Sequence, residues 1–269
     1  MCQYILGDIH MIKFCNLYSG SSGNSTYVET PTTKLLIDAG VSCQKISKAL
    51  ETLGSSLENI NGILISHEHS DHIKGIEVIS KKFNIPIYAT KKTWQAMHNL
   101  KISEDLKCFF NANEEFTLGD ISVLPFSIPH DAADPCGFSL FYNTKKITVA
   151  TDIGHIDEIL IKKMYASDVL LIESNYDKET LICGPYPYML KKRIQSDIGH
   201  LSNEATGKAV KELYENGVSN IILGHLSKEN NFPELAYQTI LNEINSSSCD
   251  LPFSLSVAKR DEVDDVITL

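Results

Sequence analysis

His67-Glu68-His69-Ser70-Asp71-His72 is the most informative stretch of this 269-residue chain. It follows the buried apolar run Gly62–Ile65, which predicts a strand. His67 and His69 are two positions apart, so in an extended loop their rings point the same way and can share one metal ion. Asp71 and His72 can face a second metal where the next helix begins. A histidine-rich surface loop is the alternative, but this density of ligand residues after a buried strand is rare. The fifth position is aspartate, so the stretch is not the H-E-x-x-H zinc-protease motif.

Four further potential ligands end predicted strands elsewhere in the chain. They are Asp38 in LLIDAG, His130 in SIPHD, Asp152 in TVATDIGH and His225 in NIILGHLS. Taken singly, each aspartate could be a turn residue or a helix N-cap, and each histidine could be a half-buried ring whose nitrogens are hydrogen-bonded within the protein. Taken together with the histidine stretch, they give five strand ends with ligand chemistry. We therefore expect all five to converge on one sheet edge, where imidazole and carboxylate suit Zn, Mn or Fe.

The rest of the chain alternates predicted strands with predicted helices in two successive sets. Sets of this kind favour an α+β fold in which two sheets pack together with helices outside. The predicted strands are 13–19, 26–29, 35–38, 62–65, 86–89, 121–128, 137–142, 146–150, 169–173 and 220–223, with weak strands at the end. The predicted helices are 42–53, 73–82, 91–100, 156–164, 203–215 and 234–245.

The ends of the chain and its composition exclude several classes of protein. No apolar stretch is long enough to span a membrane, and the N-terminus lacks the features of a secretory signal. Seven scattered cysteines without a CxxC pair argue against a disulfide framework and favour a reducing cytoplasm. Because Met11 opens a natural strand, residues 1–10 are expected to be a disordered extension, which makes His10 a poor ligand candidate. Residues 11–269 are expected to form a single domain.

The formal net charge of −10 bears on nucleic-acid binding. Non-specific coating of nucleic acid needs many lysines and arginines to replace phosphate counterions, so the charge argues against it. A local site remains possible, because two divalent ions would add positive charge at one rim. Acidic residues also concentrate away from the predicted site, as in Asp261–Asp265.

The motifs, in this order, resemble those of the metallo-β-lactamase-fold hydrolases over nearly the whole chain from Met11. The resemblance implies a four-layer αββα sandwich with two divalent metal ions at the rim of the two sheets. It implies one metal held by His67, His69 and His130, and a second held by Asp71, His72 and His225. Asp152 would bridge both metals, and Asp38 would orient the site from behind. The flavodiiron branch carries glutamate at the position of His69, so an oxygen-reducing di-iron centre is disfavoured.

Three segments narrow the resemblance to the YycJ/WalJ type, which is reported as a 5′→3′ DNA exonuclease. These segments are Ser19–Glu29, Gly184–Ile194 and Gly199–Ala205. The segment from His200 to His225 is also similar to RNase Z, the tRNA 3′-processing endonuclease, in which the first histidine contacts phosphate and the second binds metal. The resemblance thus implies a nucleic-acid substrate, most simply a DNA end.

The chemistry implied by the resemblance uses a metal-bridging hydroxide as nucleophile, since paired divalent ions lower the pKa of a shared water. Asp71 would orient this hydroxide as well as bind metal, and Asp38 would support the site. His200 is the candidate for steadying a phosphate oxygen or protonating the leaving oxygen. The alternative for His200 is an exposed residue near the helix cap Ser202.

The substrate-binding candidates come from a serine-rich segment and from an aromatic-flanked basic segment. Backbone N–H groups of SGSSGNS, residues 19–25, suit a phosphate, although the segment is equally a turn between strands and lacks the Walker pattern. Residues 186–193 suit phosphate pairing with base stacking, or else a solvated helix start. Asn175 and His155 lie near rim loops, where a structural role is the alternative. The full set of candidates is Ser21, Ser22, Asn24, Asn175, Tyr186, Lys192, Arg193 and His200.

We expect a binuclear metal-dependent phosphodiesterase acting on DNA ends. The alternatives are a small-molecule hydrolase of the same fold, acting on a thioester, lactone or cyclic phosphodiester, and a metal-dependent binding protein. A secreted lactamase is disfavoured by the missing signal, and a glyoxalase II by the missing C-terminal helical domain. The intervals 130–152 and 152–225 are too short for an RNase Z arm and an RNase J domain, respectively. Metal identity, physiological substrate and oligomeric state stay open at this point.

Overall fold

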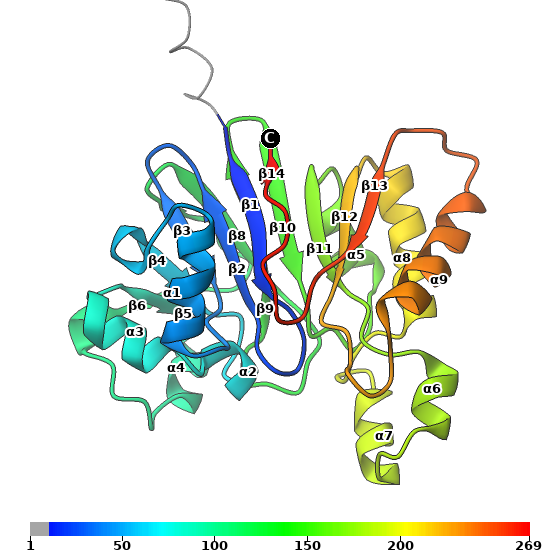
Figure 1. The fold of residues 1–269 in the computed structure, drawn as a ribbon, viewed down its shortest axis with the longest axis horizontal. Helices are drawn as coiled ribbons and strands as arrows, with labels where there is room; N and C mark the ends of the chain where they lie inside the picture. The colour runs from blue at the N-terminus through cyan, green and yellow to red at the C-terminus, as the bar shows by residue number, and fades with distance from the viewer. Residues whose placement is uncertain (1–10) are drawn as a thin grey trace, which may run out of the picture.

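Figure 1 shows two β-sheets packed face to face between outer helices in the computed structural model, which describes residues 11–269. Each sheet has seven strands, in the orders β14-β1-β2-β3-β4-β5-β6 and β13-β12-β11-β10-β9-β8-β7. The predicted α+β class and four-layer αββα sandwich are confirmed. The predicted extension, including His10, lies outside the described residues.

The first sheet is antiparallel from β1 to β3 and parallel from β3 to β6. Its last strand, β14, comes from the C-terminal end and pairs antiparallel with β1. The strands are β1 (Lys13–Tyr18), β2 (Ser25–Glu29), β3 (Lys34–Ile37), β4 (Gly62–Leu64), β5 (Ile87–Ala89), β6 (Lys107–Phe109) and β14 (Ile267–Thr268).

The second sheet repeats this plan, antiparallel from β7 to β10 and parallel from β10 to β13. Parallel strands end at the same edge of a sheet, and ligands bind outside their carboxyl ends. The loops after β3, β4, β10, β11 and β12 are therefore the places to look for a site. The strands are β7 (Phe116–Leu118), β8 (Ile121–Ser127), β9 (Cys136–Tyr142), β10 (Lys145–Ala150), β11 (Val169–Glu173), β12 (Asn220–Gly224) and β13 (Ser254–Val257).

Three apolar layers hold the sandwich together. One lies between the sheets and includes Phe14, Leu35, Phe138 and Leu171. A second packs the first sheet against its outer helices, and a third packs the second sheet against α5, α8 and α9. The helices are α1 (Cys43–Thr52), α2 (Ser70–Ile73), α3 (Ile76–Phe83), α4 (Lys91–Ala96), α5 (Glu158–Met164), α6 (Lys178–Cys183), α7 (Tyr188–Ile194), α8 (Asn203–Glu215) and α9 (Pro233–Asn245), with short 3₁₀ turns at Leu57–Asn59 and Glu104–Leu106. None of the helices in residues 11–269 is long and apolar enough to cross a membrane.

Several elements differ from the prediction. The helix predicted over 73–82 is split into α2 and α3 at Gly75, whose backbone N–H donates to the carbonyl of Ala39. A Cβ at Gly75 would lie 2.4 Å from the carbonyl oxygen of Val41, so only glycine permits this close packing. The helix predicted over 91–100 ends at Ala96. The short elements β6, β7 and α6 are not among the predicted ones, whereas α7 falls where a helix start was one of two alternatives for residues 186–193.

Candidate metal centre

Seven predicted ligands converge at the rim of the two sheets. The first sheet supplies four of them from the loop and short helix after β4, and the second supplies three from the loops after β8, β10 and β12. Their nitrogen and oxygen atoms form overlapping groups in which all atoms lie within 4.8 Å of one another. The seven are His67, His69, Asp71, His72, His130, Asp152 and His225.

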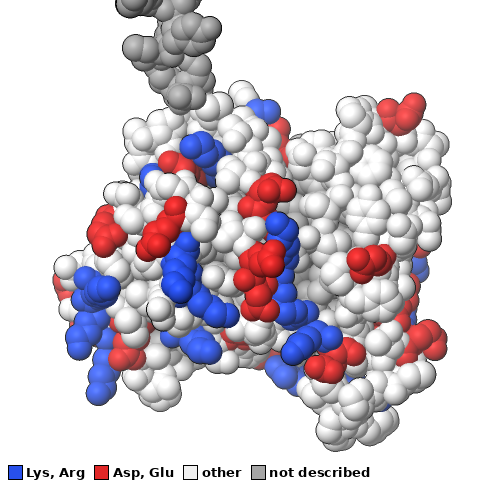
Figure 2. Space-filling model, viewed as in Figure 1, with Lys and Arg blue, Asp and Glu red and all other residues white. Residues whose placement is uncertain are grey.

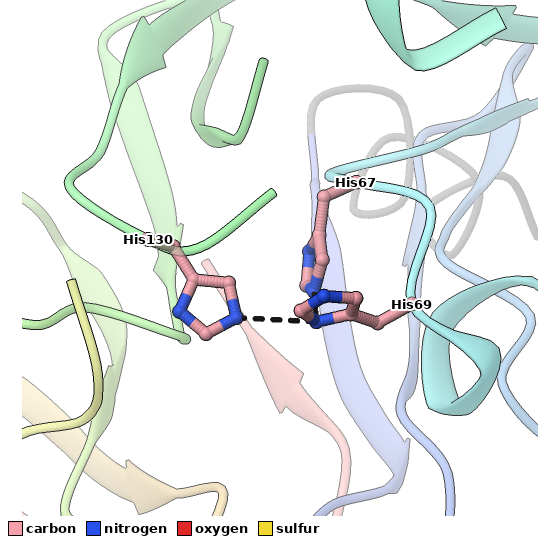
Figure 3. A group of neighbouring side chains, drawn as sticks. All are labelled: His67, His69 and His130. Carbon is pink, nitrogen blue, oxygen red and sulfur yellow. Dashed lines mark hydrogen bonds between the residues drawn. The ribbon is translucent and has the colours of Figure 1, made fainter. Parts of the chain in front are cut away.

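The first group consists of three histidines whose ring nitrogens point at one another (Figure 3). Nε2 of His67 lies 3.1 Å from Nδ1 of His69, and Nε2 of His130 lies 3.3 Å from the same atom. Nitrogens bound tetrahedrally to Zn at about 2.0–2.1 Å are themselves about 3.4 Å apart, so the three rings fit such an ion. Nδ1 of His130 donates to the carbonyl of Gly199 at 3.1 Å, which leaves the Nε2 lone pair free.

The second group joins Asp71, His72 and His225. Oδ2 of Asp71 lies 3.6 Å from Nε2 of His72 and 3.6 Å from Nε2 of His225. These separations exceed a hydrogen bond, and Nε2 of His225 is buried with no hydrogen-bond partner among residues 11–269. A buried polar atom without a partner is expensive, and a cation bound among these three side chains would satisfy it.

Asp152 lies between the two groups. Its Oδ1 is 3.8 Å from Nε2 of His130, in the first group, and its Oδ2 is 3.3 Å from Nε2 of His72, in the second. Oδ2 is buried and has no hydrogen-bond partner in the described part of the chain. One carboxylate therefore presents one oxygen to each group, the arrangement expected of a bridging ligand.

Asp38 holds His72 from behind. Oδ2 of Asp38 lies 2.7 Å from Nδ1 of His72, and the same carboxylate accepts hydrogen bonds from the backbone and hydroxyl of Ser66. With Nδ1–H donating to the carboxylate, Nε2 of His72 is left to face the site. The position matches the supporting role predicted for Asp38.

Glu173 performs the same task for His225, and the sequence reasoning missed it. Oε1 of Glu173 lies 2.7 Å from Nδ1 of His225 and 2.9 Å from Nδ1 of His200. Its Oε2 accepts the backbone N–H groups of Ile153 and Leu201. The available signal was an acidic residue ending the buried strand β11, as Asp38 follows β3.

Without metal, burial and neighbouring charges shift the pKa values of the histidines in this centre. Burial lowers the pKa of His67 well below its ordinary value, helped by the neighbouring His72 ring, which favours the neutral imidazole that can bind a metal. Burial also opposes charge on His72 and His225, but the Asp152 carboxylate outweighs it. The pKa of His72 is raised well above its ordinary value, and that of His225 to about 10. Metal binding must therefore displace protons from this centre.

Three residues of the centre adopt a backbone conformation that side chains disfavour. Asp38, Asp152 and His225 have φ values of 60°, 61° and 55°, in the left-handed region. All three follow the carboxyl end of a strand, where the chain must turn sharply to aim a side chain into the rim. Strain of this kind clusters at functional sites because the surrounding structure holds it in place.

A pocket of about 230 Å³ opens onto the centre. Four of the predicted ligands line it, together with most of the residues predicted to contact substrate. Of the predicted substrate contacts, the pocket is lined by Ser21, Asn175, Tyr186, Arg193 and His200. Tyr186, Leu190, Arg193 and Ile194 thus form one wall, and His200, just before α8, also lines the pocket, with Nδ1 2.9 Å from Glu173.

Three predicted substrate contacts lie elsewhere. Ser22 is exposed and outside the pocket lining. Asn24 is buried among the predicted ligands, with Nδ2 3.1 Å from Nε2 of His72 and 3.4 Å from the Asp71 carboxylate, and its backbone pairs with Asp71 and Gly40. Lys192 turns away, with Nζ 4.9 Å from the centre of the Tyr188 ring. His155, noted in the sequence only as lying near a rim loop, is exposed, and its Nδ1 lies 2.9 Å from the carbonyl oxygen of Asp197.

The chain matches the family model described as "Beta-lactamase superfamily domain" over residues 33–226. It is 42% identical over 236 residues to the exodeoxyribonuclease WalJ of Streptococcus pneumoniae serotype 2, covering 86% of this chain and 88% of that protein. It is 38% identical over 231 residues to the exodeoxyribonuclease YycJ of Bacillus anthracis, covering 85% and 88%. Its fold is similar to that of the metallo-β-lactamase fold protein YhfI of Bacillus subtilis, with TM-score 0.72, 15% identity and coverage of 94% and 98%.

Proposed function

We propose that this chain, which belongs to the β-lactamase superfamily, hydrolyses phosphodiester bonds at DNA ends as a metal-dependent 5′→3′ exonuclease. The observation that carries the proposal is the double ligand set, in which Asp152 presents one oxygen to each group of side chains. The 42% and 38% identities to two exodeoxyribonucleases, over most of the length of both proteins, support the DNA substrate.

The residues assigned to hold metal fall into two sets that share Asp152. His67, His69 and His130 would hold one ion, and Asp71, His72 and His225 the other. When bound, two divalent ions lower the pKa of a shared water and stabilise negative charge on the phosphate. Imidazole and carboxylate ligands favour Zn, Mn or Fe over Mg or Ca. Asp38 and Glu173 keep His72 and His225 in the ligating tautomer.

His200 is the residue assigned to the substrate. Its Nδ1 is held by Glu173, so the opposite ring nitrogen, Nε2, is free for the pocket that the ring lines. From there it can donate a hydrogen bond to a phosphate oxygen or a proton to the leaving oxygen. Asp71 also lines this pocket, where it can orient a water for attack.

The cysteines of the described residues are free thiols, which supports a reducing cytoplasm as the compartment in which the enzyme acts.

The test combines metal analysis with DNA cleavage. The purified protein, loaded with Zn²⁺ or Mn²⁺, is incubated with 5′-labelled single- and double-stranded DNA. We expect bound metal, release of label from the 5′ end, and loss of both in His67→Ala. The control is His98→Ala, because His98 is exposed on the outer side of the first sheet. Metal binding with turnover of a thioester or cyclic phosphodiester, but not of DNA, would contradict the proposal.

A further inference from the structure

Arg193 joins the hairpin formed by α6 and α7 to the loop that follows β8. The hairpin projects beyond the sheet rim, below the second sheet in Figure 1, and Arg193 lies in the last turn of α7. Its Nη2 donates a 3.1 Å hydrogen bond to Oδ1 of Asp131, and its Nε donates to Oδ2 of the same carboxylate. Two parallel hydrogen bonds of this kind fix the plane of the guanidinium as well as its position.

The hairpin does not depend on this ion pair to keep its shape. Leu181 and Ile194 are buried in a small core of its own, and Nζ of Lys191 donates a 2.7 Å hydrogen bond to the carbonyl of Gly184. The Arg193 side chain, in contrast, is 53% exposed, and exposed ion pairs add little to stability. The fixed orientation of Arg193 is therefore better explained by what the guanidinium can bind.

The paired guanidinium keeps one edge free. An arginine has five N–H donors, and Asp131 takes one from Nε and one from Nη2. These are the only side-chain hydrogen bonds that Arg193 makes within residues 11–269, and neither uses Nη1. The edge formed by Nη1 and Nη2 can therefore donate to two oxygens of one phosphate while Asp131 still holds the other edge.

This free cation belongs to the pocket of the metal centre. Among the described residues that line the pocket, Arg193 is the only lysine or arginine. Figure 2 shows basic and acidic side chains interleaved over the face that it draws, and the chain has a net charge of −10. A substrate with several phosphates therefore has to be held by individually placed cations and not by a broad basic surface.

Asp131 also places Arg193 relative to the assigned metal ligands. Its Oδ1 lies 3.1 Å from Nη2 of Arg193 and 3.5 Å from Nε2 of His130. The guanidinium is thus one carboxylate away from the first ligand group, close to it but outside it. A phosphate next to the one at the metal centre can reach such a position. In an enzyme that starts at a 5′ end, the strand continues only on the 3′ side of the bond that is cut.

We propose that Arg193, held by Asp131, binds the phosphate one nucleotide to the 3′ side of the scissile phosphate. This inference rests on the proposed function, which assigns the scissile phosphate to the metal centre. The substrate class selected is a strand with a second negative charge at that spacing, which a thioester, a lactone and a cyclic phosphodiester all lack. A phosphate contact does not depend on base pairing, so the inference applies equally to duplex ends and to single strands.

The test removes the charge from one phosphate of the substrate. The bond cut first in a 5′-labelled DNA duplex is identified from the product length, and the linkage to its 3′ side is then made as a neutral methylphosphonate. With this duplex and the metal-loaded wild type, we expect KM for the first cut to rise about tenfold with kcat nearly constant. A methylphosphonate near the far end of the same strand is the substrate control and should leave KM unchanged.

The matching change in the protein is Arg193→Gln. It should raise KM for the unmodified duplex by the same factor, and the neutral linkage should then add less than about twofold, because the contact is already lost. Arg193→Lys keeps the charge without the fork, so we expect an intermediate KM. Lys81→Gln, an exposed lysine in the last turn of α3, is the matched control.

A small diester shows whether the variants are otherwise intact. Bis(p-nitrophenyl) phosphate has a scissile phosphate but no neighbouring one. Its hydrolysis should therefore stay within about twofold of the wild type in both Arg193 variants.

Salt dependence measures the contact independently. Arg193→Gln should lower the slope of log KM against log salt concentration by about 0.9 for a duplex, because one phosphate contact is lost. Lys81→Gln should leave the slope unchanged. An unchanged slope in Arg193→Gln would contradict the inference.

Three other results would overturn it. They are an unchanged duplex KM in Arg193→Gln, an equal effect of the neutral linkage in Arg193→Gln and in the wild type, and an equal loss on duplex and small diester. The last result would place Arg193 at the scissile phosphate. If the wild type hydrolyses the small diester but cuts no DNA, the proposed function itself fails, which is distinguishable from all of these.

Discussion

Nδ1 of His225 donates a 2.7 Å hydrogen bond to Oε1 of Glu173, a carboxylate buried completely at the end of β11. The same oxygen lies 2.9 Å from Nδ1 of His200. Burial opposes the charge on Glu173, but the neighbouring His200 and His225 rings outweigh it and lower its pKa to about 2. One carboxylate thus orients both an assigned metal ligand and the histidine assigned to the substrate.

Replacing Glu173 with glutamine should weaken metal binding. Oε1 of Glu173 faces both ring nitrogens, and Oε2 accepts the backbone N–H groups of Ile153 and Leu201. An amide has only one acceptor oxygen, so its NH₂ group would face either the two rings or the two backbone N–H groups, and the side chain could no longer hold His225 in place. We expect the affinity for one of the two ions to fall about 10- to 100-fold, measured by competition with a chromophoric chelator. Glu68→Gln is the control, since glutamine can still accept the hydrogen bond from the backbone of Ala133. Unchanged affinity for both ions in the Glu173 variant would contradict the assigned role.

Gly40→Ala should disrupt the second ligand group. A Cβ at Gly40 would lie 1.6 Å from the carbonyl oxygen of Asp71, so the loop carrying Asp71 must move. We expect one metal ion to be lost, as measured by elemental analysis of the purified protein. Gly54→Ala is the control, because its Cβ meets nothing within 4 Å. Because the φ of Gly54 is 68°, alanine there should lower the free energy of unfolding by about 1 kcal/mol while the protein keeps its full metal content. Two bound ions in Gly40→Ala would refute the argument.

His200→Asn should separate catalysis from metal binding. Because His200 lines the pocket and belongs to neither of the two ligand sets assigned above, we expect both metal ions to be retained. Loss of the proton donor should reduce kcat for DNA about 10²- to 10⁴-fold, measured under saturating substrate. His98→Asn serves as the control on an exposed histidine. Near-normal kcat, or loss of metal, in His200→Asn would contradict the assignment of His200 as a proton donor outside the ligand sets.

Removing metal should expose Cys136. The pKa of this thiol is raised to about 12, chiefly by burial, so it scarcely ionises at pH 8 while the protein is closed. Its backbone N–H donates a 3.0 Å hydrogen bond to the carbonyl of Ser66, which links the second sheet to the loop that carries the predicted ligands of the first sheet. Metal ions would tie the same two parts together. We therefore expect a chelator to speed maleimide labelling of Cys136, followed by peptide mass spectrometry.

Two other thiols provide the controls for this labelling experiment. Cys183 is exposed and should react quickly with or without chelator. Cys15 is buried in β1, and its pKa is also raised to about 12, so it should stay slow unless the whole protein unfolds. Equal rates for Cys136 in both conditions would show that the metal does not hold the rim closed.

Strongly periodic segments were predicted well. Strand β11 and helix α8 have the predicted bounds. The continuous apolar run of β11 can be buried only as a strand, and the long amphipathic pattern of α8 can bury its apolar face only as a helix. The three-residue strands β6 and β7 were missed, since so short a strand is defined by its partner and not by its own sequence. The six- and seven-residue helices α6 and α7 are likewise too short to form without tertiary packing.

The sequence by itself determined which side chains carry ligand chemistry, because strand ends and residue types are local properties. His67, His130 and His225 each follow an apolar run that predicts a strand, and nothing distant is needed to see it. The family resemblance already implied how these side chains are grouped, but only the tertiary structure decided which oxygen of Asp152 faces each group. It also decided that Glu173 lies behind His225. These relationships join residues from two separately folded sheets, so they exist only once the apolar layer between the sheets has closed.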